Sequence, residues 1–180
     1  MGGSFTTING TPRNYIAAVN TNTGVLQNWD PNPNSYVYTI ALTTNDVVAG
    51  GIFTTIGNKW AYRFGVISKT TAVTENGFVS YNSQVNKISV RGDSILTCGN
   101  YSATAYYSQY SAKVTTSTII PDYNFPATNG TIRTVVPDGS GNYYVGGSFT
   151  TIGGVNQAYL AKLNSSFQVI TSWAPLVNGE

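Results

Sequence analysis

The side chains that most often perform catalysis are scarce in this sequence. It contains no histidine, one cysteine (Cys98), and nine basic against seven acidic residues, which gives a formal net charge of +2. Histidine is the commonest general base and a frequent metal ligand, and a nucleophilic cysteine needs a basic partner. The usual nucleophilic triads are therefore excluded, and we expect no catalytic residues, no metal site and no cofactor.

The acidic residues leave one other route to catalysis. They fall mostly in predicted turns and are Asp30, Asp46, Glu75, Asp93, Asp122, Asp138 and Glu180. A glycoside hydrolase needs two carboxyl groups across one cleft, and no segment supplies an obvious pair. Acids that are distant in sequence can still meet in a folded chain, so part of a glycoside-active enzyme stays open as an alternative.

Two short motifs favour turns over ligand sites. Arg91-Gly92-Asp93 has the letters of an integrin-type adhesion tripeptide, and residues 138–142 resemble part of a calcium loop. The second segment lacks the distal bidentate glutamate of such a loop. Because glycine and aspartate are also common in turns, we interpret both motifs as turns.

Aromatic side chains give the best indication of a binding function. Thirteen tyrosines and three tryptophans stand among many uncharged polar residues, a composition suited to stacking on sugar rings and bonding their hydroxyls. Several tyrosines cluster near Tyr101, and an exposed tryptophan on a loop is costly without a partner. The candidate binding residues are Trp60, Tyr106, Tyr107 and Tyr110. As alternatives, the tyrosines fill core space and Trp60 caps an edge.

A repeat of 48 residues must position these side chains. Its signature, Gly2-Gly3-Ser4-Phe5-Thr6-Thr7-Ile8, recurs from Gly50 and from Gly146, with an eroded copy at Cys98-Gly99-Asn100-Tyr101 between them. The chain is one domain, 1–180, whose predicted units cover approximately 1–35 (incomplete), 36–83, 84–130 and 131–180. The structural residues of the repeat are Gly2, Gly3, Phe5, Trp29, Gly50, Gly51, Phe53, Tyr101, Gly146, Gly147, Phe149 and Trp173.

Each unit has the pattern of β-strands. Residues 36–42 and 85–90 are rich in β-branched and aromatic side chains, and turn residues and further apolar runs follow them. Gly, Pro, Asn and Thr interrupt every window long enough for a helix. We expect an all-β chain with four strands in each unit, paired glycines at a bulge or close approach, and the signature aromatics in the core. Four strands per 48 residues match the blades of a β-propeller.

The signature Gly-Gly-x-Phe-Thr-x-Ile-Gly, with a following Ala-x-Leu strand and Trp-x-Pro exit, resembles the delta-60 type β-propeller repeats of bacterial surface, secreted and phage-associated proteins. The resemblance covers essentially the whole chain. It implies a propeller, or a partial one of about four blades, and an extracellular, cell-surface or virion location, although the chain carries no signal peptide. It implies little about the molecular role.

These observations predict a non-catalytic binding or adhesion module that recognises a surface glycan or protein. The first unit lacks a counterpart of residues 36–49, so an unpaired blade edge should remain. A structural subunit completed by neighbouring blades or by other copies of itself is therefore an alternative. Sparse charge argues against nucleic acid, and no apolar run is long enough for membrane insertion.

Overall fold

The chain is built from strands and loops. The computed structural model describes residues 1–74, 80–92, 94–102, 109–115, 121–122 and 125–179 of the 180. Sixteen strands and no helix occur in this part, which confirms the all-β prediction. Accordingly, the described residues include no helix long and apolar enough to cross a membrane.

Most strands belong to three antiparallel sheets, which we call sheets A, B and C. Their strand orders are β3-β4-β7, β11-β10-β9-β8 and β12-β13-β16. Sheet A contains β3 (Val37–Leu42), β4 (Asp46–Gly51) and β7 (Phe64–Ser68). Sheet B contains β8 (Val85–Arg91), β9 (Ser94–Ser102), β10 (Gln109–Thr115) and β11 (Pro121–Asp122). Sheet C contains β12 (Ile132–Pro137), β13 (Tyr143–Gly147) and β16 (Leu160–Leu163).

Each of the three intact copies of the glycine-rich signature ends in the first strand of a short hairpin. The first pairs β1 (Thr7–Ile8) with β2 (Thr11–Pro12), the second β5 (Thr55–Ile56) with β6 (Lys59–Trp60), and the third β14 (Thr151–Ile152) with β15 (Val155–Asn156). Both turn residues of each hairpin have positive φ, at Asn9 and Gly10, Gly57 and Asn58, and Gly153 and Gly154. Two-residue turns of this left-handed kind match the twist of paired strands.

The fourth run predicted for each unit forms a strand only in sheet B, where β11 has two described residues. Beside sheet A it is reduced to a bridge between Ile67 and Thr74, and beside sheet C to one between Leu163 and Val169. In both places a left-handed residue, Ala72 or Phe167, turns the chain just before the run.

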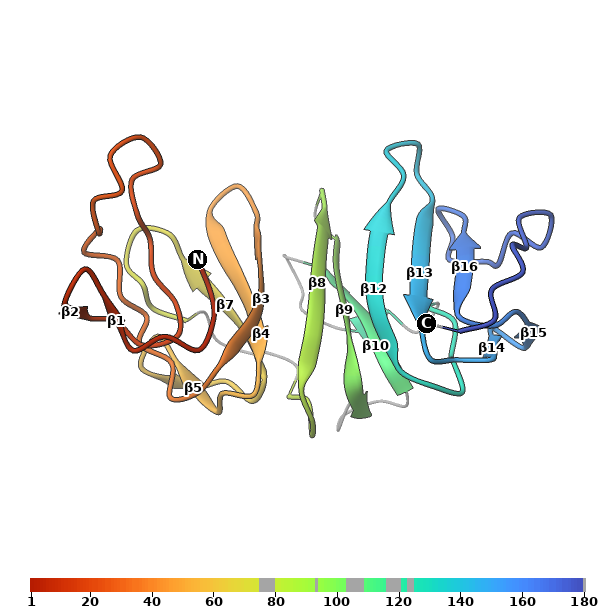
Figure 1. Ribbon diagram of the computed structural model, residues 1–180, viewed down its shortest axis with the longest axis horizontal. Helices are drawn as coiled ribbons and strands as arrows, with labels where there is room; N and C mark the ends of the chain where they lie inside the picture. The colour runs from red at the N-terminus through yellow and green to blue at the C-terminus, as the bar shows by residue number, and fades with distance from the viewer. Residues whose placement is uncertain (75–79, 93, 103–108, 116–120, 123–124, 180) are drawn as a thin grey trace.

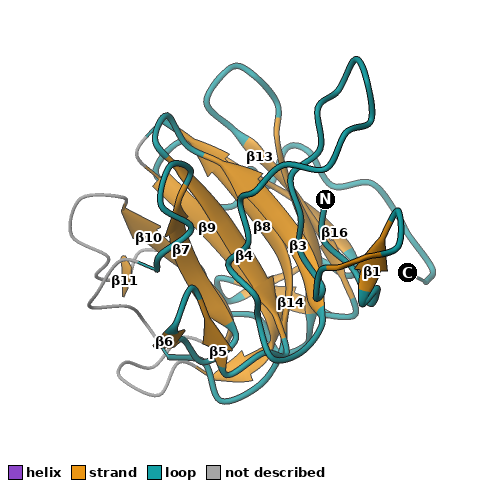
Figure 2. Cartoon of the chain, turned by 90° about the vertical axis from the view of Figure 1, so that its left-hand side faces the viewer, coloured by secondary structure: helices purple, strands orange, loops and turns teal. Residues whose placement is uncertain are grey.

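The sheets lie face to face in an open row. Sheets A, B and C follow one another along the longest axis, with the first hairpin at one end and the third at the other (Figure 1). In the view at right angles the sheets overlap (Figure 2). β3 contacts β8, and β8 contacts β12, so the first strands of the three sheets are neighbours.

Apolar side chains fill each interface in the row. Phe53 and Ile67 of the sheet A region pack with Ile16 of the N-terminal segment (residues 1–29). The other two clusters join sheet A to sheet B and sheet B to sheet C. Their largest fully buried side chains are Phe64, Tyr81, Ile95, Tyr101, Ile132, Phe149, Ile152 and Leu163. The interfaces between units, and not the sheets alone, therefore form the core.

The second glycine of the signature lies where the backbone is crowded. A Cβ atom on Gly51 would collide with the carbonyl oxygen of Tyr36, and one on Gly147 with that of Thr131. Both glycines lie at a register shift, between β3 and β4 or between β12 and β13. Only a residue without a side chain permits this approach.

Candidate binding surfaces

Two exposed aromatic rings stack on the second hairpin. The Trp60 side chain is 73% exposed and that of Tyr62 is 45% exposed. Their ring centroids are 5.9 Å apart and the planes are inclined by 15°. The sequence singled out Trp60 as a candidate, and the structure adds Tyr62, whose position two residues later places it on the same side of an extended chain.

The local backbone explains why this pair is held in place. Trp60 pairs with Thr55 in the second hairpin, whose turn contains Gly57 and Asn58. The chain then passes through Arg63, which has a φ of 71°. The Arg63 guanidinium donates hydrogen bonds to the carbonyls of Ile52 (2.8 Å) and Phe53 (3.2 Å). The segment that carries the rings is thus anchored at both ends, which lowers the entropy lost on binding.

The hairpin does not need aromatic residues to form. In the first hairpin the register places Pro12 opposite Thr7, and in the third it places Asn156 opposite Thr151, where Trp60 stands opposite Thr55. The positions that correspond to Tyr62 are Asn14 and Ala158. The same backbone therefore forms with small or polar side chains, and the two rings are a feature of the second hairpin alone among the three.

Only part of the tyrosine cluster predicted from the sequence lies among the described residues. Tyr106 and Tyr107 lie outside the described residues, and Tyr110 lies in β10, of which only the backbone is described. Tyr101 is buried. The Thr97 hydroxyl is hydrogen-bonded both to the Tyr101 hydroxyl and to the Tyr81 hydroxyl. Burial raises the pKa of both Tyr81 and Tyr101. Tyr101 is therefore part of the core between sheets A and B.

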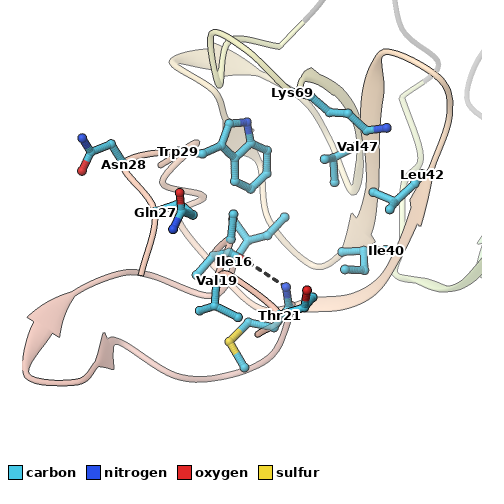
Figure 3. A pocket seen from close by; sticks show the side chains of 13 residues that line it. Ile16, Val19, Thr21, Gln27, Asn28, Trp29, Ile40, Leu42, Val47 and Lys69 are labelled. Atoms are coloured by element: carbon cyan, nitrogen blue, oxygen red, sulfur yellow. Dashed lines mark hydrogen bonds between the residues drawn. The ribbon is translucent and has the colours of Figure 1, made fainter. Parts of the chain in front are cut away.

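A groove with a volume of about 640 Å³ opens between the N-terminal segment and sheet A (Figure 3). Its apolar lining includes Ile16, Val19, Trp29, Ile40 and Leu42. Two polar groups at its rim are already bonded. The Trp29 indole donates to the carbonyl of Ser68 (2.9 Å), and the Lys69 ammonium donates to that of Thr43 (2.6 Å). The groove thus presents a mostly apolar surface.

Comparison of equivalent strands shows why the groove exists. Ile40, Ile88 and Val135 occupy the same register position in β3, β8 and β12, opposite Ala49, Thr97 and Val145. Ile88 is 3% exposed and Val135 2%, whereas Ile40 is 36% exposed. Sheet A covers β8 and sheet B covers β12, but no strand of the N-terminal segment covers β3 in the same way. Sequence reasoning did not find this groove, because all three strands have the same apolar pattern.

Of the two short motifs predicted to form turns, the structure describes residues 138–142 in full and Arg91-Gly92-Asp93 in part. Asp93 lies outside the described residues, while Arg91 and Gly92 are exposed at the end of β8. The Asp138 carboxylate accepts hydrogen bonds from the backbone of Ser140 and Asn142 and lies 3.2 Å from the Lys162 ammonium. The Asn142 side chain and these other donors hold the Asp138 pKa below its usual range. The calcium-like segment thus has the contacts of a turn.

Comparison with known proteins supports a propeller-type repeat. A family model described as a domain of unknown function (DUF5122) beta-propeller matches residues 137–166. No curated protein matches the chain. The crystal structure of the computationally designed Ika8 protein is similar with a TM-score of 0.59 and 11% sequence identity, over 86% of this chain and 41% of that one. The chain thus spans less than half the length of that protein, and the likeness shows the fold alone. Together these findings identify an all-β chain with a propeller-type repeat.

Proposed function

We propose that this chain is a non-catalytic binding module with about four β-propeller blades of the delta-60 type, which recognises glycans through Trp60 and Tyr62. Its setting is a cell surface, a secreted protein or a virion. The stacked, exposed pair on the second hairpin carries the proposal. The first and third hairpins form without aromatic residues at these positions, so the hairpin backbone does not depend on the pair.

The chemistry of the pair suits a sugar ring. Two nearly parallel faces offer a flat apolar surface for the C–H groups of a pyranose, and aromatic rings lose little conformational freedom on binding. Lys59 and Arg63 flank the pair in sequence, and the Arg63 guanidinium is bonded to the carbonyls of Ile52 and Phe53. Because the second hairpin is anchored through Arg63, the surface exists before the ligand arrives.

The proposal is tested by screening the chain on an array of neutral and acidic glycans and measuring the best ligand by isothermal titration calorimetry. Trp60→Ala should lower affinity by about 30-fold, since a central aromatic contributes about 2 kcal/mol to such a site. Tyr62→Ala should have a smaller effect in the same direction. Both variants should keep the urea midpoint of the parent, because exposed side chains contribute little to stability.

A matched control is available on sheet A. Tyr38 is 47% exposed, almost the same as Tyr62, but no other ring of the described residues stacks on it. Tyr38→Ala should leave glycan affinity unchanged. Glycan binding that is insensitive to both Trp60→Ala and Tyr62→Ala, or no binding to any glycan on the array, would contradict the proposal.

A further inference from the structure

An asparagine clamps the second and third hairpins in the same way. The Asn34 side-chain oxygen accepts hydrogen bonds from the backbone N–H groups of Thr54 (2.8 Å) and Thr55 (3.0 Å), and its amide donates to the Thr54 hydroxyl (2.7 Å). In the third hairpin the Asn129 oxygen accepts from Thr150 (2.8 Å) and Thr151 (2.9 Å), and its amide donates to the Thr150 hydroxyl (2.6 Å). Both clamps fix the first strand of a hairpin to the linker that precedes a sheet.

The first hairpin has the same two threonines and no clamp. Thr6 and Thr7 occupy the positions of Thr54 and Thr55, and both are exposed. No described residue accepts a hydrogen bond from the backbone N–H of either one in the manner of Asn34. The neighbouring Ile8 is only partly buried, whereas its counterparts Ile56 and Ile152 are fully buried. The first hairpin thus presents an unoccupied copy of a site that is filled twice elsewhere.

A corresponding asparagine lies near the C-terminus. Asn178 follows Trp173 by five residues, as Asn34 follows Trp29, and each segment has a proline two residues after the tryptophan. Asn178 is exposed, and its amide has no hydrogen-bond partner among the described residues. Leu176, in the same segment, is fully exposed. The segment from Trp173 to Asn178 therefore has the clamp residue and nothing in the described structure to clamp.

The indoles of Trp29 and Trp173 differ in the same way as the two asparagines. The Ser68 carbonyl accepts hydrogen bonds from both the Ala72 N–H (3.1 Å) and the Trp29 indole (2.9 Å). The Asn20 carbonyl, 48 residues earlier, accepts from the Gly24 N–H (2.8 Å) in the same kind of turn, and no indole is bonded to it. The Trp173 indole nitrogen has no acceptor in the described part of the chain. A second donor and acceptor pair is thus separated in the same way as the asparagine and its threonines.

We propose that copies of this chain associate head to tail, with the segment from Trp173 to Asn178 of one copy docked on the first hairpin of the next. Asn178 of one copy clamps Thr6 and Thr7 of its neighbour, and the Trp173 indole donates to the neighbour's Asn20 carbonyl. The first hairpin lies beyond sheet A at one end of the row, whereas the C-terminus lies beside sheet C, so one copy does not satisfy itself (Figure 1).

The contact joins two different surfaces, so repeated application gives either a closed ring or an open filament. The aromatic pair on the second hairpin takes no part in the contact, so self-association and glycan binding can fail separately.

The first test is the mass of the 180-residue chain in solution, measured by sedimentation velocity over a wide range of concentrations. We expect a concentration-dependent species of at least two copies, and Asn178→Ala should weaken association about tenfold or more, because three hydrogen bonds are lost. Asn45→Ala is the control, since Asn45 is exposed in the turn between β3 and β4 and belongs to neither of the two proposed surfaces. A monomer at every concentration, or an oligomer unaffected by Asn178→Ala, would overturn the proposal.

Disulfide trapping gives an independent test of orientation. Thr6→Cys and Asn178→Cys proteins, mixed under mild oxidation, should form a mixed disulfide between two chains. Cys98 is buried, and burial raises its pKa to about 12, so it does not compete. The Asn34→Cys, Thr54→Cys double variant calibrates the geometry, because it should close the same bond within one chain. Exclusive trapping of two Thr6→Cys chains, or of two Asn178→Cys chains, would indicate a symmetric contact and overturn the head-to-tail arrangement.

Discussion

The first and third hairpins begin from the same seven-residue signature and have different surroundings. Phe149 and Ile152 of the third are fully buried between sheets B and C. Phe5 and Ile8 of the first are only partly buried. Identical side chains on similar backbones thus contribute to a core at one end of the row and line a surface at the other.

The difference lies in what covers each hairpin. The third hairpin has a sheet on its inner side and the Asn129 clamp on its linker. No residue of the first hairpin belongs to a buried cluster and no described asparagine clamps it, and the groove beside Ile40 opens between the N-terminal segment and sheet A. A repeat signature therefore specifies a local backbone and a potential interface, and the neighbouring unit decides whether that interface becomes core.

The largest expected contrast comes from truncating the signature phenylalanine. Phe149→Ala should lower the free energy of unfolding by about 3–5 kcal/mol, because it leaves a cavity in a closed interface. Phe5→Ala should cost only about 1 kcal/mol, since less of its surface is removed from water. Urea unfolding followed by tryptophan fluorescence measures both values. Equal losses would mean that the first hairpin is as well packed as the third and that the comparison is wrong.

A smaller contrast is expected at the second glycine of the signature. Gly147→Ala places a methyl group against the Thr131 carbonyl, whereas at Gly3 the nearest atom to a new Cβ is a ring carbon of Phe5 at 3.4 Å. We expect Gly147→Ala to cost about 2 kcal/mol and Gly3→Ala to stay within about 0.5 kcal/mol of the parent. The same urea titration gives both numbers, and a destabilised Gly3→Ala protein would indicate a crowding that the structure does not show.

Much of the fold could be predicted because the strands depend on local pattern. The alternation at 36–42 and 85–90 predicts strands that β3 and β8 match within one residue at each end. The extent of the fourth strand of each unit was overestimated. The apolar pattern of residues 168–173, for example, does not show that a left-handed turn at Phe167 leaves only one β-bridge. Phe5, expected in the core, is partly buried for the reason given by the comparison of the hairpins.

The candidate site was less accessible to sequence reasoning. Trp60 stood out because its counterparts in the repeat are not aromatic, and Tyr62 could have been found by the same comparison with Asn14 and Ala158. The groove at Ile40 could not, because its apolar letters match those of buried counterparts. The asparagine clamp was also missed, since Asn34 and Asn129 stand among many asparagines and only the hydrogen bonds distinguish them.

The smallest expected contrast separates an occupied clamp from an unoccupied one. Asn129→Ala removes one acceptor shared by two backbone donors and one bond to a hydroxyl, all at an exposed position, so the free energy of unfolding should fall by about 1 kcal/mol. Asn178→Ala should leave the unfolding free energy of the isolated monomer unchanged, because its amide has no partner within the described part of its own chain. Measuring both in dilute solution separates folding from association. A loss of monomer stability in Asn178→Ala would mean that Asn178 has a partner within its own chain. The contrast between an occupied clamp at Asn129 and an unoccupied one at Asn178 would then be wrong.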